Sequence, residues 1–86
     1  MAYEIRIRRE AARKLQALGA KDRARITEKI VMLGDNPDDP RLDVKRLVGE
    51  PYHRMRVGNW RVIYDRQDQL RIISIEKIKP RGDAYK

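Results

Sequence analysis

Apolar and charged side chains alternate over residues 3–7, and this period of two predicts a half-buried strand. The spacing then changes. Between Arg9 and Leu18 the apolar positions recur at helical intervals, which predicts a helix. Gly19 follows directly and suits the C′ position of that helix.

A second helix is predicted from about Asp22 to Leu33, because its apolar residues again form one stripe. Asp22 is the expected N-cap and Gly34 the expected end, with Pro37 preventing continuation. Since residues 19–21 alone separate the two helices, they should form an αα-hairpin.

The second half of the chain has a β pattern. A short extended piece is expected at Val44–Leu47, and three strands at His53–Val57, Trp60–Asp65 and Leu70–Lys77. Gly58-Asn59 is a two-residue hairpin turn. The fold class is therefore α+β: one domain over residues 1–86, with an N-terminal strand, a helical hairpin and an antiparallel β-meander.

The Gly58-Asn59 turn also sets a register in which Arg56 lies opposite Arg61. Strand alternation then places Arg54, Arg56 and Arg61 together on one face of the hairpin, which we expect to be exposed to solvent without interleaved acids. Directly opposed like charges destabilise a sheet, so this cluster indicates a phosphate site. The other face should be core, and it carries Met55, Val57, Trp60, Val62 and Tyr64.

Charge supports a polyanionic partner. The chain has 21 Lys and Arg against 13 Asp and Glu, a formal net charge of +8, with most of the surplus after residue 40. It has no cysteine and one histidine, which excludes disulfides, thiolate metal sites and histidine-rich metal sites; no metal ligand set and no cofactor are expected. No apolar run is long enough to cross a membrane, and the N-terminus lacks a signal-peptide pattern, so a cytoplasmic location is expected.

Other polar and aromatic residues have simpler interpretations. His53 and Trp60 fall on the core side of the hairpin and are expected to pack there. The cations at the start of the chain, Arg6, Arg8, Arg9, Arg13 and Lys14, are expected to form a solvated surface. The C-terminal segment IEKIKPRGDAYK has too few apolar residues for core, so its cations and Tyr85 are candidates for function.

The opening MAYEIRI, the segment KRLVGEPYHRMRVGNWRVIY and the final PRGDAYK together resemble the RelE/ParE superfamily of type II toxins, and RelE more than ParE. The resemblance implies the RelE-like microbial ribonuclease fold. It also implies a metal-independent endoribonuclease that cleaves mRNA in the ribosomal A site by 2′-OH attack on the adjacent phosphate. An acidic RelB-like antitoxin would neutralise it in a hetero-oligomer.

The resemblance assigns the site residue by residue. The two basic positions of the hairpin fall on Arg54 and Arg56, and the arginine of the next strand on Arg61. The late arginine falls on Arg81, with Lys79 as its rival, and the C-terminal tyrosine on Tyr85. Further contacts to RNA are expected from Lys77, Lys79 and Arg46.

Three departures from the family pattern matter. Arginines stand where the family often has lysines, and arginine is a poor general base, which leaves Tyr85 or an arginine-activated 2′-OH for that step. Val48 stands at a position that is often arginine, and the final helix of some members is missing. Two alternatives stay open: a ParE-like DNA gyrase inhibitor without nuclease activity, and an inactive RNA-binding relative.

Overall fold

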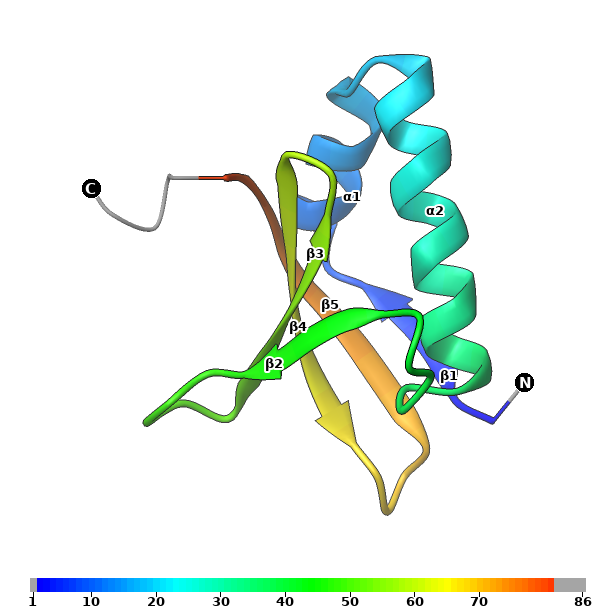
Figure 1. Cartoon of the computed structure of the whole chain (residues 1–86), viewed down its shortest axis with the longest axis vertical. Coiled ribbons are helices and arrows are strands. Elements are labelled where there is room, and N and C mark those ends of the chain that lie inside the picture. Colours follow the sequence, from blue (N-terminus) through cyan, green and yellow to red (C-terminus); the bar gives the residue numbers. More distant parts are fainter. Residues whose placement is uncertain (1, 82–86) are drawn as a thin grey trace.

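The computed structural model describes residues 2–81, which form two helices and one five-stranded mixed sheet (Figure 1). This confirms the expected α+β class. The strand order is β1-β5-β4-β3-β2. Along the chain the elements are β1 (Glu4–Ile7), α1 (Arg9–Ala17), α2 (Ala20–Asp35), β2 (Asp43–Arg46), β3 (Tyr52–Val57), β4 (Trp60–Gln67) and β5 (Ile72–Pro80).

The last four strands form the expected antiparallel meander, whereas β1 joins its edge in parallel with β5. The pairing of β1 covers only Ile72–Ile75, the first half of β5. The chain then enters α1 at once, and α1 packs against β5. Among residues 2–81, the second half of β5 therefore has no strand on that side and is bordered by α1 instead.

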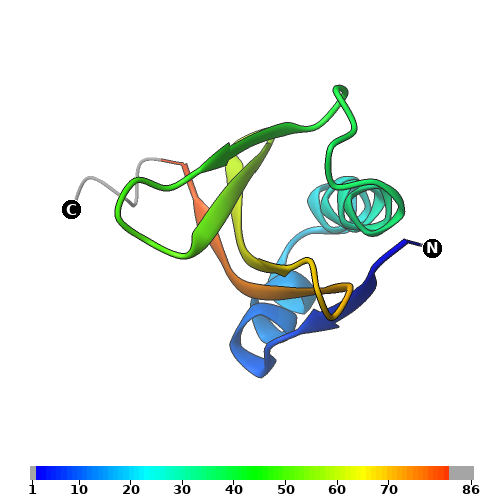
Figure 2. The same cartoon turned by 90° about the horizontal axis from the view of Figure 1, so that it is seen from below.

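The core lies between the sheet and the helices, and in Figure 2 the sheet curls around the side on which α2 lies. Fully buried side chains of α2 pack against side chains of the strands that face inward. Most of these inward-facing residues are two apart along a strand, because side chains alternate between the two faces of a sheet. The core residues include Ala11, Ile26, Leu33, Met55, Val57, Val62, Tyr64, Ile73 and Ile75. We call the opposite side of the sheet the outer face. No helix within residues 2–81 is long and apolar enough to cross a membrane.

The connection between the two helices is shorter than the sequence predicted. Gly19 does not adopt the left-handed conformation of a C′ residue; it is extended (φ −60°, ψ 154°) and is the N-cap of α2, its carbonyl accepting a hydrogen bond from the Arg23 amide at 2.9 Å. Asp22 is therefore not the cap. It lies in the first turn of α2, and its carboxylate accepts a hydrogen bond from the Trp60 indole at 3.1 Å. Gly34 is also not the end of the helix, because α2 continues to Asp35.

The last strand is longer than predicted and contains a bulge. It extends to Pro80, so Lys79 belongs to the sheet as well as Lys77, which the predicted strand already included. A register shift between Ile63 and Tyr64 on β4 leaves an extra residue on β5. The spacing of the buried isoleucines reflects this extra residue. Ile73 and Ile75 are two residues apart, whereas Ile75 and Ile78 are three apart. The bulge thus changes which side chains of β5 reach the outer face.

Candidate functional site

The β3–β4 hairpin has the predicted register. Gly58 takes φ 58°, and Arg56 pairs with Arg61 across the hairpin. On the other side of β4, Arg61 pairs with Lys79 and Ile63 with Lys77. Since directly paired residues share a face of a sheet, the hairpin arginines and the two lysines of β5 lie on the outer face together.

A cavity of about 400 Å³ opens on this face. We call it the outer-face cavity. Its walls come from β3, β4, β5 and the β2–β3 connection, and they carry four cations against two carboxylates. The lining residues are Leu47, Glu50, Tyr52, Arg54, Arg61, Ile63, Glu76, Lys77 and Lys79.

Arg54 departs from the expectation of an exposed arginine. Only 8% of the residue is accessible, and it is the only charged residue buried within the part of the chain that the structure describes. Its Nη1 atom is buried and has no hydrogen-bond partner among those residues. A buried polar atom without a partner costs roughly 1–3 kcal/mol, and more for a charged group, so folding alone does not account for this guanidinium.

Arg56 and Arg61 differ from Arg54 and from each other. Arg56 is exposed and is not part of the cavity lining, whereas Arg61 is half-buried and lines it. The expectation that no acid interleaves with the arginines is wrong for Arg56, because β2 begins at Asp43 and this residue pairs directly with Arg56. Arg54 and Arg61 thus line the cavity, whereas Arg56 lies at its rim beside the Asp43 carboxylate.

The bulge in β5 brings Glu76 and its neighbour Lys77 into the same cavity. Glu76 is held in place: its carboxylate accepts a hydrogen bond from Ser74 Oγ at 2.7 Å and another from Arg8 Nε at 3.2 Å. Within residues 2–81, Arg54, Lys77 and Lys79 form no side-chain hydrogen bond or ion pair. The cavity therefore contains cations that form no ion pair with a carboxylate of the described residues.

Three polar lining residues are not among those predicted from the sequence, namely Glu50, Tyr52 and Glu76. The change in isoleucine spacing from two to three along β5 is the signal that would have indicated Glu76. Nothing in the local pattern indicates Glu50, because its place in the cavity depends on how the β2–β3 connection lies over the sheet.

The remaining predicted site residues are more dispersed. Arg46 pairs with His53 on β3 and lines a different cavity beside Tyr64 and Arg66, on the other side of the sheet from the outer-face cavity. Arg81 is exposed, and its amide donates to the Asn59 carbonyl at 2.7 Å, which holds it beside the hairpin turn. Tyr85 lies outside the described residues.

His53 and Tyr64 are packing residues, as predicted for the histidine. Their rings stack with centroids 5.3 Å apart. Burial lowers the pKa of His53, and the nearby Arg66 and Arg46 lower it further. Burial raises the pKa of the Tyr64 phenol to about 12. Both side chains are therefore uncharged near neutral pH and contribute no charge to either face of the sheet.

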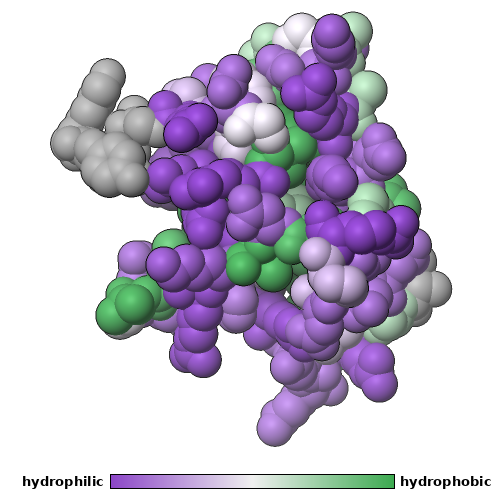
Figure 3. Space-filling model, in the orientation of Figure 1, coloured by the Kyte–Doolittle hydropathy of each residue, from purple (hydrophilic) through white to green (hydrophobic). Residues whose placement is uncertain are grey.

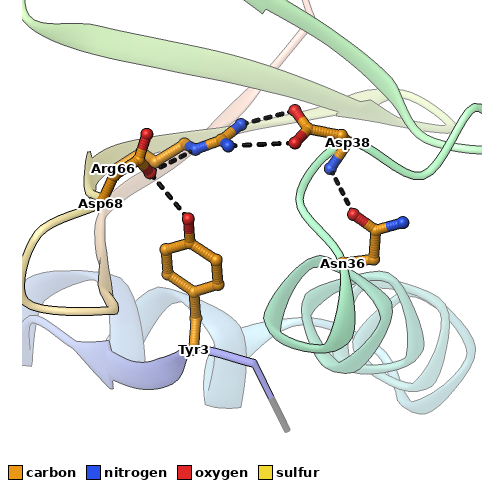
Figure 4. Close-up of polar contacts among 5 residues, drawn as sticks. All are labelled: Tyr3, Asn36, Asp38, Arg66 and Asp68. Atoms are coloured by element: carbon orange, nitrogen blue, oxygen red, sulfur yellow. Dashed lines mark hydrogen bonds and ion pairs between the residues drawn. The ribbon is translucent and has the colours of Figure 1, made fainter.

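A second charged cluster, the Arg66 network, lies at the other end of β4 (Figure 4). The Arg66 guanidinium donates two hydrogen bonds to Asp38, at 2.8 and 3.1 Å, and one to Asp68 at 2.7 Å. Asp68 also accepts a hydrogen bond from the Tyr3 hydroxyl at 2.8 Å. The network joins the N-terminal segment, the loop after α2 and the β4–β5 turn, so its charge is used within the fold.

Hydrophilic side chains cover most of the surface shown in Figure 3, and one of the apolar areas among them lies over the β2–β3 connection. That connection includes Val48, a residue that is 94% exposed. Among residues 2–81 no three His, Asp or Glu side chains are placed so that they could hold a metal ion. The chemistry available in the outer-face cavity is therefore cationic, with two carboxylates beside it.

Comparison with known proteins adds the family. A family model described as the ParE toxin of the type II toxin-antitoxin system parDE matches residues 5–85. A toxin from Methanocaldococcus jannaschii named RelE1 is 34% identical over 88 residues, which cover 100% of this chain and 98% of that protein. The chain belongs to the RelE/ParE superfamily of type II toxins, and it is RelE-like.

Solved structures of RelE-type proteins agree with this assignment. The archaeal RelE–RelB complex from Pyrococcus horikoshii contains a chain that is 32% identical, with a TM-score of 0.85 and coverage of 96% of this chain and 99% of that chain. The intact E. coli RelBE complex matches with a TM-score of 0.77 at 18% identity, covering 92% of this chain and 96% of that chain, which supports the fold alone. The chain is thus a RelE-like toxin of a type II toxin-antitoxin system.

Proposed function

We propose that this RelE-like toxin is an endoribonuclease that cleaves mRNA in the ribosomal A site. The observation that carries the proposal is the outer-face cavity, and above all the buried Arg54 guanidinium with an unpaired Nη1. A phosphate group supplies the acceptor oxygens that this guanidinium lacks, and arginine matches phosphate with two parallel hydrogen bonds.

The proposed reaction needs no metal. The 2′-oxygen attacks the adjacent phosphorus, the bond from phosphorus to the 5′-oxygen breaks, and the products are a cyclic phosphate and a 5′-hydroxyl end. Arg61 and Arg54 line the cavity and would hold the scissile phosphate, stabilising the extra negative charge of the transition state. Arg56 at the rim would bind the neighbouring phosphate, with Lys77 and Lys79 along the path of the RNA.

Two protons must move in this reaction. The 5′-oxygen takes one from water as it leaves, and Arg81, held beside the hairpin turn, would stabilise the negative charge that develops on that oxygen. The 2′-OH gives one to a base, for which Tyr85 and the cavity carboxylate Glu50 are chemically suited, whereas the arginines are not. Tyr85 would also stack on a nucleobase of the RNA and so orient the nucleotide.

The proposed partners follow from charge and from the relatives. Two of the similar proteins are RelE proteins, one of them in a complex with RelB. A chain of net charge +8 would bind an acidic antitoxin of this kind in a hetero-oligomer and would act in the cytoplasm, where ribosomes are. Because exposed charge pairs are screened by salt, part of the antitoxin affinity should be lost between low salt and about 1 M salt.

The deciding experiment expresses the toxin alone and maps the 5′ ends of mRNA on stalled ribosomes. We expect growth arrest together with new 5′-hydroxyl ends inside reading frames, and co-expression of the antitoxin should remove both. Growth arrest without new ends would contradict the proposal. Gyrase-dependent DNA breaks in that case would support the ParE-like alternative, which the description of the matching family model favours.

A further inference from the structure

A second and larger cavity, of about 720 Å³, lies between α1 and β5. We call it the α1–β5 cavity. Five cations line it: Arg9, Arg13 and Lys14 from the helix, and Lys77 and Lys79 from the strand. Glu10 is the one carboxylate among its lining residues. Such a surplus of one charge in a concave surface attracts polyanions.

The cavity exists because β1 is short. Its pairing ends at Ile75, so the second half of β5 presents an open edge to α1. On α1, Arg9 and Arg13 are four residues apart and therefore lie on the same side of the helix. Both are exposed, and within residues 2–81 neither forms an ion pair, whereas Arg6, Arg8, Arg41 and Arg66 each do.

The α1–β5 cavity adjoins the outer-face cavity across β5. Lys77 and Lys79 line both, since they stand on the strand that separates the two. The two lysines are two residues apart along β5, which spaces them about 6.6 Å apart along the strand axis. An extended polyanion that leaves the outer-face cavity across β5 would meet this pair and then the two arginines of α1.

We infer that the α1–β5 cavity binds the phosphodiester backbone of RNA outside the cleaved position, and that Arg9 and Arg13 are its anchoring residues. The inference rests on the proposed function in taking RNA as the polyanion. The two lysines shared with the cavity that would hold the scissile phosphate favour RNA over an acidic peptide. Lys14 contributes less, because its ammonium already lies 5.4 Å from the centre of the Trp60 ring.

The test measures binding of the toxin to a 20-nucleotide 2′-O-methyl RNA, which cannot undergo attack by a 2′-OH, over a series of salt concentrations. Arg9→Ala/Arg13→Ala should make the slope of log K against log salt shallower by about 1.4, since each lost phosphate contact on a single strand removes about 0.7. At 0.1 M salt this corresponds to binding that is roughly 10- to 30-fold weaker.

The matched control is Lys21→Ala/Arg23→Ala, which removes the same charge from exposed positions of α2 that line neither cavity. It should leave the slope unchanged. Arg9→Lys/Arg13→Lys keeps the charge and should also keep the slope, which separates loss of contacts from loss of folding. An unchanged slope in the alanine variant, or equal losses in variant and control, would overturn the inference.

Two further results separate this inference from the proposed function. Weaker binding of an acidic antitoxin peptide to the alanine variant, with RNA binding intact, would make the cavity a protein-docking surface and overturn the inference. A shallower RNA slope in a toxin that yields no new mRNA ends on ribosomes would support the RNA surface and contradict the nuclease. The two proposals can therefore fail independently.

Discussion

Arg54 and Arg66 extend from neighbouring antiparallel strands, yet only the charge of Arg66 is paired with carboxylates of the described residues. Arg66 donates hydrogen bonds to two aspartates and joins three segments of the chain. Arg54 is buried in a cavity wall, and its Nη1 has no partner in residues 2–81. The first arginine has its charge paired with carboxylates and links parts of the fold. The second leaves a buried donor without a partner, at a cost in stability, and under the proposed function this donor would bind a phosphate.

The largest expected effect concerns Arg61, the cavity arginine that would contact the scissile phosphate. Arg61→Ala should reduce mRNA cleavage on ribosomes by about 100- to 1000-fold, because it removes a donor that stabilises transition-state charge. Primer extension on a defined message would measure the rate. Arg41→Ala, which removes an exposed arginine paired with Asp39, is the control and should change the rate less than threefold. Similar losses in both variants would mean that net charge, and not the cavity, sets the rate.

Arg54→Met should have opposite effects on activity and stability. Replacing a buried, incompletely bonded charge with an apolar side chain of similar length should raise the free energy of unfolding by about 1 kcal/mol and Tm by about 4–8 °C. Cleavage should fall by at least tenfold. Calorimetry and the ribosome assay measure the two effects.

Arg56→Met, on the same strand but exposed, is the matched control and should give no gain in stability. If Arg54→Met instead lowered Tm, Arg54 would be a residue of the fold like Arg66, and the contrast between the two regions would disappear.

Arg66→Gln should have the smallest effect on chemistry and a clear effect on stability. Tm should fall by roughly 5 °C at neutral pH, with little change in cleavage per folded molecule. The Arg66 guanidinium lowers the pKa of both Asp38 and Asp68. Their contribution is therefore complete above the unfolded pKa of about 3.9 and is lost as pH falls through the lower folded values.

The Tm difference between wild type and Arg66→Gln should accordingly shrink below about pH 4. Thermal melts from pH 2 to pH 7 would show this. A difference that stays constant over that range would mean that Arg66 acts through packing and not through its aspartates. A large loss of cleavage in Arg66→Gln would show that the network also supports the site.

The strand register and the packing of the histidine could be predicted from turn residues and from the alternation of apolar side chains. The β3–β4 register is confirmed because the Gly58-Asn59 turn and the alternation of apolar residues specify the same pairing. The packing of His53 against Tyr64 followed from the same alternation. Helix ends were less predictable: Gly19 caps α2 and does not end α1, since either role suits a glycine between two helices.

What the sequence determined by itself is the set of elements and the face of the hairpin on which the arginines lie, because turn chemistry and side-chain periodicity act between near neighbours. Only the tertiary structure decided that Arg54 is buried, that Asp43 flanks Arg56, and that Lys77 and Lys79 stand between two cavities. Those features depend on which strands meet, on the bulge in β5 and on the short pairing of β1. Segments far apart in the chain must come together before a charge becomes paired or remains available for a ligand.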